Sequence, residues 1–158
     1  MLRPLLLIIG VGKTKVKVMK KYIERKTELL GEGWRAHPYG CVCSAIALTT
    51  GRTFDEAVEL ATKELNYDSK SGVMSDMLYN WLDNSPEWEM VGVQEYLNEY
   101  KVGGQVVLRR PRAASIAKKL SRGKYMLITR GHATAVIEGE LIEYKPKRIV
   151  NSVYKYVG

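Results

Sequence analysis

The feature that most constrains the fold is a cysteine at the point where a turn gives way to an apolar helix. Gly40 interrupts regular structure, and residues 41–48 are largely apolar until Gly51 ends the run. Cys41 is therefore predicted at a helix N-terminus, where unpaired backbone N–H groups and the helix dipole favour the thiolate. Two interpretations of this stretch stay open: Cys41 is a nucleophile, or Cys41 and Cys43 are both buried packing residues.

Length and composition predict a single domain, residues 1–158, with a hydrophobic core of its own. The chain has 158 residues, 46% of them hydrophobic. Cys41 and Cys43 are too close in sequence for an ordinary disulfide, and His37 and His132 are not in metal-ligand spacing. The apolar run at residues 5–9 is too short to span a membrane. We therefore expect reduced thiols in a cytoplasmic protein without a cofactor, a metal site or a membrane segment.

The net charge is strongly positive. Lys and Arg number 25 against 17 Asp and Glu, which gives +8, and the excess lies mainly in residues 13–26 and 109–124. Basic clusters of this kind bind nucleic acid or acidic protein surfaces, or simply form a solvated face. Aromatic side chains that would stack on bases are sparse nearby, with Tyr22 and Tyr125 the candidates. Nucleic-acid binding is therefore an alternative that the charge alone allows.

The first half of the chain is predicted to be mainly helical. Residues 1–37 form an N-terminal extension with a buried strand or arm at 5–9, a short strand at 15–18 and a basic amphipathic helix. The side chains at helical spacing in that last segment are Met19, Tyr22, Ile23, Lys26, Leu29 and Leu30. Residues 38–84 form the helical part with Cys41, in which a second helix begins at a Thr53–Glu56 capping box and a third covers 74–82.

The second half is predicted to be mainly sheet. The expected elements are a strand at 88–91, a helix at 93–100, a turn at 103–104, a strand at 106–108 and a small helix at 113–120. Antiparallel strands follow at 124–130, 132–138, 140–144 and 149–157, separated by glycine turns. Helices come first and sheet comes last, which predicts an α+β fold.

Two residues of this sheet are candidate partners for Cys41. His132 begins a strand directly after Gly131, which would hold its imidazole rigidly where a helix-borne thiol can meet it. Beyond the Gly139 turn lies Glu143, and a tight hairpin would set residues 134 and 143 opposite each other. A carboxylate there can accept a hydrogen bond from the imidazole and fix its tautomer.

Two segments carry a family resemblance. Residues 40–57 resemble the nucleophile helix of small papain-like cysteine peptidase-fold proteins common in bacteriophages. Residues 123–143 resemble the part of those proteins that carries a Gly-His-x-x-Ala-Val motif and an acid. The resemblance covers roughly 38–84 and 113–157. It implies a papain-like fold with N-terminal helices packed on a C-terminal antiparallel sheet, and it implies Cys41 as nucleophile, His132 as general base and Glu143 as orienting acid.

The sequence also departs from the family pattern. Arg35 occupies the position six residues before the nucleophile, where papain-like peptidases place a Gln that donates to the oxyanion. Arg35 is therefore a candidate oxyanion donor, with the backbone N–H of Cys41 as the other candidate. Glu143 stands where the family has Asp or Asn.

Three functions are compatible with these features. The first is a papain-like thiol hydrolase that cleaves an amide or thioester bond of a protein or peptide through an acyl-enzyme at Cys41. The second is a catalytically silent protein of the same fold that binds a host protein, which would place it in the host cytoplasm if a phage encodes it. The third is a basic nucleic-acid-binding protein. The sequence leaves the substrate, the oligomeric state and any association with a virion open.

Overall fold

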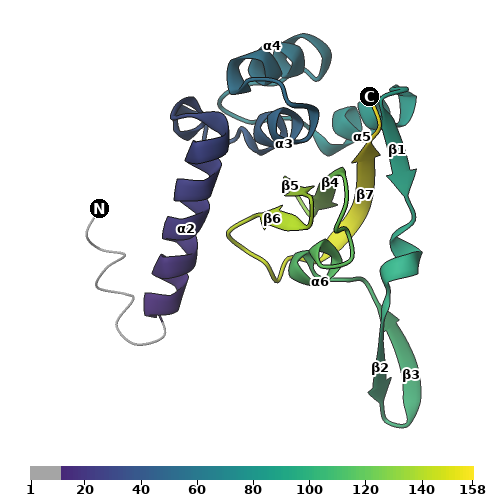
Figure 1. Ribbon diagram of the computed structural model, residues 1–158. Helices are drawn as coiled ribbons and strands as arrows, with labels where there is room; N and C mark the ends of the chain where they lie inside the picture. The colour runs from purple at the N-terminus through teal and green to yellow at the C-terminus, as the bar shows by residue number, and fades with distance from the viewer. Residues whose placement is uncertain (1–11) are drawn as a thin grey trace.

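Helices precede an antiparallel sheet along the chain, as expected for an α+β fold (Figure 1). The computed structural model describes residues 12–158, so the predicted strand or arm at 5–9 lies outside the described residues. The helical half consists of α2 (Gly12–Leu30), the 3-10 helix η1 (Gly33–Ala36), α3 (Cys41–Thr50), α4 (Phe54–Glu64) and α5 (Ser75–Asn84). No helix in this described part is both long and apolar enough to cross a membrane.

The boundaries of α3 and α4 follow the local sequence. Gly51 caps the C-terminus of α3: its φ is 78° and its backbone N–H donates to the carbonyl of Ala47, and a glycine takes this left-handed conformation without steric cost. α4 begins with the predicted capping box: Thr53 Oγ1 accepts from the Glu56 N–H, and Glu56 Oε1 accepts from the Thr53 N–H. The C-terminal end of α3 and the N-terminal end of α4 are therefore both set by local contacts.

Five antiparallel strands form the main sheet in the order β1-β7-β4-β5-β6. Their bounds are β1 (Trp88–Val91), β4 (Lys124–Thr129), β5 (His132–Ile137), β6 (Glu140–Ile142) and β7 (Val150–Tyr156). Ala135 pairs with Ile142 across the β5–β6 hairpin, so the register predicted for positions 134 and 143 is confirmed. The hairpin therefore returns the chain to the start of β5, where His132 lies.

Both faces of the sheet are covered. Met126 and Ile128 of β4 belong to the core cluster with α3, whereas Leu127 belongs to a second cluster with the short helix α6 (Ala113–Ala117). This alternation is the period of two that a strand imposes on its side chains. Because α3 packs directly on β5 and β4, the N-terminus of α3 is held beside the first residue of β5.

Two local predictions are wrong. Residues 15–18, predicted as a short strand, belong to the helix α2. Val18 and Tyr22 lie one helical turn apart on this helix and line the same groove against β6. The alternation of Val16 and Val18 covers only four residues, and the helical spacing of the longer segment determines the structure here.

The helix predicted at 93–100 is also wrong. A 3-10 helix η2 (Val93–Tyr96) is followed by β2 (Asn98–Val102), which pairs with β3 (Gln105–Arg109). Gly103 and Gly104, both with positive φ, form the turn that makes this cross-strand pairing possible. The resulting two-stranded hairpin projects away from the main sheet (Figure 1) and is exposed along almost its whole length.

Candidate active site

Cys41 is the first residue of α3, and the loop before it folds tightly enough to require a glycine. A Cβ on Gly40 would come within 2.9 Å of His37 Cβ and 3.1 Å of the His37 carbonyl oxygen. The Gly40 N–H donates to that same carbonyl at 3.0 Å. Cys41 is partly exposed, whereas Cys43 is 0% exposed and packs in the core. Only one of the two thiols can therefore meet a substrate.

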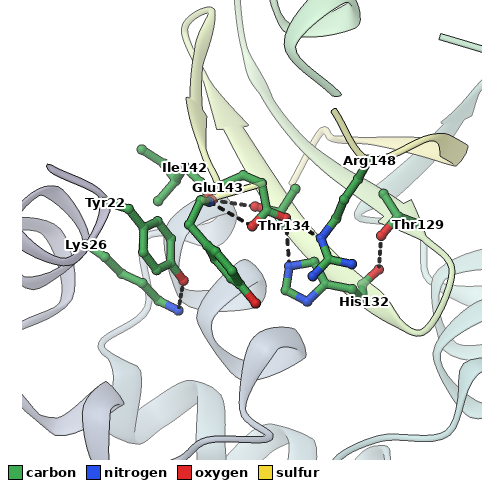
Figure 2. A network of polar contacts seen from close by, with 9 residues as sticks. Tyr22, Lys26, Thr129, His132, Thr134, Ile142, Glu143 and Arg148 are labelled. Atoms are coloured by element: carbon green, nitrogen blue, oxygen red, sulfur yellow. Dashed lines mark hydrogen bonds and ion pairs between the residues drawn. The ribbon is translucent and has the colours of Figure 1, made fainter. Parts of the chain in front are cut away.

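His132 and Glu143 lie side by side, as the hairpin register predicted. His132 is the first residue of β5, and its Nε2 lies 2.9 Å from Glu143 Oε2 (Figure 2). The side chain of Glu143 is only 1% exposed; its Oε1 accepts the backbone N–H of Tyr144 at 2.9 Å. Because Glu143 occupies Nε2, the other ring nitrogen, Nδ1, is left for the thiol.

A further contact fixes the segment that carries the acid. The Thr134 hydroxyl donates to the carbonyl of Ile142, the residue before Glu143. This bond ties the end of β6 to β5 at the point where the strand ladder stops. Glu143 is therefore held by its backbone on the side of His132, independently of its own charge.

The electrostatics of Cys41 and His132 favour a thiolate and an imidazolium. Burial raises the pKa of the Cys41 thiol, but the interaction with His132, the Ala133 backbone N–H and the charge of Lys26 outweigh it and leave the pKa below its ordinary value. Burial lowers the pKa of His132, but its interactions with Cys41 and Glu143 raise it overall to about 9. By contrast, burial raises the pKa of Cys43 to about 12. The pattern is that of an activated nucleophile with its base.

The pair opens into a cleft of about 510 Å³ between α2, η1, α3 and the β4–β5 turn. Arg35, the predicted oxyanion donor, lies exposed in η1 and lines this cleft, with no hydrogen bond to another described side chain. His37 also lines the cleft, but its Nδ1 is 2.8 Å from the hydroxyl of Tyr67 and its ring packs on Phe54. His37 is therefore bound to the core, and His132 is the imidazole that meets the thiol.

Sequence reasoning missed two charged residues of the site. Arg148, in the loop between β6 and β7, places Nε 3.2 Å from Glu143 Oε2. No periodicity or motif marks that loop, so the sequence carried no signal for it. Lys26 lines the cleft beside Cys41, and here a signal existed. It occupies a position in the otherwise apolar stripe of α2, four residues after Tyr22 and four before Leu30, where a buried side chain is expected.

Among the residues that the structure describes, no group of three or more His, Cys, Asp or Glu side chains is arranged to hold a metal ion. The described side chains of the site supply a thiol, an imidazole, a carboxylate and nearby cations. Comparison of the chain with protein-family models, with curated proteins and with solved structures finds no match. The geometry of Cys41, His132 and Glu143 is consequently the basis for any assignment of function.

Proposed function

We propose that the chain is a papain-like thiol hydrolase that cleaves an amide or thioester bond through an acyl-enzyme at Cys41. One observation carries this proposal: a thiol at a helix N-terminus meets an imidazole whose far nitrogen contacts a buried carboxylate, and all three border one cleft. This is the arrangement of nucleophile, base and orienting group used in acyl transfer.

Each side chain has a defined step in the proposed reaction. His132 holds the proton of the Cys41 thiol, and the thiolate attacks the substrate carbonyl carbon, so that a C–S bond forms and the carbonyl becomes an oxyanion. The oxyanion collapses, the bond to the leaving nitrogen or sulfur breaks, and the imidazolium gives that group its proton. Water, deprotonated by His132, then attacks the thioester and releases the acid and the free thiol.

The two predicted oxyanion donors differ in how well they suit this role. The backbone N–H of Cys41 belongs to the first residue of α3 and has no acceptor within the helix, so it is free to bind an oxyanion. Arg35 lines the same cleft but is exposed. Glu143 holds the imidazole and supports the imidazolium, a role that its buried carboxylate and its fixed backbone suit.

The order of these parts also supports the papain-like fold as part of the proposal. The nucleophile lies on the first helix of the core, and the histidine and the acid follow on adjacent antiparallel strands. An α+β fold by itself is compatible with many functions, so the fold adds support only together with the site.

The first experiment measures how fast iodoacetamide alkylates each cysteine near pH 6, with peptide mass spectrometry to separate Cys41 from Cys43. We expect fast alkylation of Cys41 that is lost in His132→Ala, while the buried Cys43 stays unlabelled in both proteins and reports that they are folded. Slow and equal labelling of the two thiols in the wild type would overturn the proposal.

The second experiment separates a hydrolase from a silent protein with a reactive thiol. Incubation with 4-nitrophenyl acetate should add one acetyl group to Cys41, visible in the intact mass, and the acetyl group should then be lost by hydrolysis. Cys41→Ser should acquire no acetyl group at this position on the same time scale. An acetylated Cys41 that is never hydrolysed would rule out turnover.

A further inference from the structure

Lys26 is a buried cation that forms no ion pair with any carboxylate of the described residues. It lies in the middle of α2, is only 7% exposed, and its Nζ is 2.9 Å from the hydroxyl of Tyr22. The same nitrogen lies 4.1 Å from the centre of the Trp34 ring. Among the side chains that the structure describes, no carboxylate is within ion-pair distance of it. An ammonium has three N–H donors. One donates to the Tyr22 hydroxyl and the charge lies over the Trp34 ring, so N–H groups remain that can donate to an anionic ligand.

The side chain of Lys26 extends toward Cys41 and His132. Together with Cys41 and His132 it lines the main cleft, and the same three residues also line a small cavity behind the thiol. Figure 2 shows Lys26 reaching inward from α2 together with Tyr22. Its charge contributes to the lowered pKa of Cys41.

The helix that carries Lys26 is fastened to the sheet next to this cleft. Arg25, its neighbour, binds both oxygens of Glu140 on β6, at 2.7 and 2.8 Å. Tyr22 packs against Tyr144, the residue that follows Glu143. Lys26 is therefore positioned from two sides, as expected for a residue that has to meet a ligand at a defined place.

The cleft around Lys26 is electropositive. Its basic lining residues are Lys26, Arg35, His37 and His132, and no Asp or Glu of the described residues lines it. The apolar and aromatic side chains that complete the walls lower the local dielectric constant, which strengthens the attraction of the Lys26 ammonium for an anion. If the acyl group were neutral or cationic, acylation would remove the charge of Cys41 and leave the buried ammonium with only the charge of Glu143 to compensate it.

We infer that Lys26 Nζ is the centre of an anion subsite beside Cys41, which binds a carboxylate on the acyl part of the substrate. The inference rests on the proposed function, because it assumes that the substrate acylates Cys41, and it narrows the substrate class to anionic acyl donors. Burial lowers the pKa of Lys26 to about 8, opposed by the charges of Cys41 and Glu143, so the ammonium is the dominant form at neutral pH.

Two alkylating agents of nearly the same shape test the subsite: iodoacetate, which carries a carboxylate, and iodoacetamide, which is neutral. The measured quantity is the second-order rate constant of iodoacetate at Cys41 divided by that of iodoacetamide. A change in the Cys41 pKa alters both rates equally and cancels in this ratio, whereas a cation that binds the carboxylate raises it. We expect the ratio in the folded wild type to exceed that of the urea-unfolded chain by about tenfold or more, which corresponds to about 1.4 kcal/mol.

Matched variants assign the effect to one residue. Lys26→Met should bring the ratio down by about tenfold, and Lys26→Arg, which keeps the charge, should retain most of it. Lys21→Met removes an exposed lysine from the same helix and should leave the ratio unchanged. The inference is overturned if Lys26→Met keeps the wild-type ratio, or if the folded and unfolded wild type give equal ratios.

The same data keep the two proposals apart. If iodoacetamide alkylates Cys41 fast in a way that depends on His132, but the ratio equals that of the unfolded chain, the proposal of an anion subsite is wrong and that of a thiol hydrolase is kept. Slow alkylation by iodoacetamide would overturn the hydrolase whatever the ratio. A ratio that falls in Lys21→Met as much as in Lys26→Met would show general charge attraction by α2 and would overturn the subsite.

Discussion

His132 Nε2 lies 2.9 Å from Glu143 Oε2, and the Glu143 side chain is almost completely buried. A buried carboxylate at this distance favours the charged form of the imidazole and fixes the ring with its other nitrogen toward Cys41. Arg148 approaches the same carboxylate oxygen at 3.2 Å, so the negative charge is compensated even when His132 is neutral. The activation of Cys41 therefore depends on a residue that does not touch it.

Glu143→Gln should slow the reaction of Cys41 with iodoacetamide near pH 6 by about tenfold or more. The substitution keeps the shape of the side chain but removes the charge that supports the imidazolium, which lowers the pKa of His132 and with it the thiolate fraction. It should also lower the free energy of unfolding by roughly 1–3 kcal/mol, less than for a fully buried ion pair because Arg148 is partly exposed.

The matched control is Glu138→Gln, which removes an exposed carboxylate from the turn of the same hairpin, where it makes no ion pair with another described residue. It should change neither the rate at Cys41 nor, by more than about 1 kcal/mol, the free energy of unfolding. Alkylation of Cys41 at the wild-type rate in Glu143→Gln would show that the carboxylate does not activate the pair. Both quantities come from alkylation kinetics and urea unfolding of the same preparations.

The pH dependence of the proposed acyl transfer should be bell-shaped. The acid limb reports formation of the thiolate and should lie below the ordinary thiol value, because His132 lowers the pKa of Cys41. The basic limb reports loss of the imidazolium and should lie near pH 9, the raised pKa of His132. Since the two groups interact, the limbs belong to the pair and not to either residue alone.

A comparison of leaving groups checks which limb belongs to the imidazolium. A thioester or amide substrate, whose leaving group needs a proton, should show both limbs. A 4-nitrophenyl ester, whose leaving group departs as an anion, should keep the acid limb and lose the basic one. A basic limb near pH 6.5, the ordinary value for histidine, would contradict the interaction with Glu143 and Cys41.

Much of the framework of this site was predictable from the sequence. Gly40 and Gly51 mark the ends of α3 by backbone chemistry that acts within a few residues. The hairpin register that sets Glu143 beside His132 follows from the strand period of two and the Gly139 turn. Both signals act within a few residues or across one turn, so they can be recognised in the sequence without knowledge of the tertiary structure.

The remainder depended on contacts between distant segments. β2 exists because β3 pairs with it across a glycine turn, and that pairing overrides the helical spacing of residues 93–100. Arg148 joins the site only because its loop passes over Glu143. Lys26 is the intermediate case: its place in an apolar stripe predicted burial, but only the packing of α2 shows that it is buried beside a thiol.

The buried lysine should cost stability, and the cost should depend on pH. The pKa of Lys26 is lowered from 10.5 to about 8, so the unfolded chain binds more protons than the folded one between these values, and stability rises with pH across this window. Below pH 8 the full penalty applies, on the order of 3 kcal/mol. Lys26→Met should therefore unfold at higher urea concentration than the wild type at pH 7.

The difference between Lys26→Met and the wild type should shrink as the pH rises from 8 to 10.5, since the wild-type lysine becomes neutral in the folded state. Groups that do not interact with Lys26 titrate equally in both proteins and cancel in the difference, and Cys41→Ser introduced into both proteins removes the thiol whose pKa Lys26 lowers. A gap that stays constant across this window would mean that Lys26 keeps its charge in the fold. A stabilised variant that has also lost the preference for iodoacetate would show that the charge serves the site at the expense of the fold.

Gly40→Ala should disturb the site without touching any of its reactive groups. The added Cβ would lie 2.9 Å from His37 Cβ and 3.1 Å from a backbone oxygen, so the loop before Cys41 has to move. We expect a loss of roughly 1–3 kcal/mol in the free energy of unfolding. Alkylation of Cys41 near pH 6 should fall by about tenfold, because a displacement of about 1 Å is enough to break the alignment of a catalytic pair.

Gly92→Ala is the matched control, because Gly92 has a φ of −65° and a Cβ there would meet no atom within 4 Å. It should leave both the urea unfolding midpoint and the rate at Cys41 unchanged. If Gly40→Ala behaves like Gly92→Ala, the loop absorbs the methyl group and the position of Cys41 does not depend on this close contact. If only Gly40→Ala loses reactivity while both variants stay folded, the tight turn before α3 is what holds the thiol against His132.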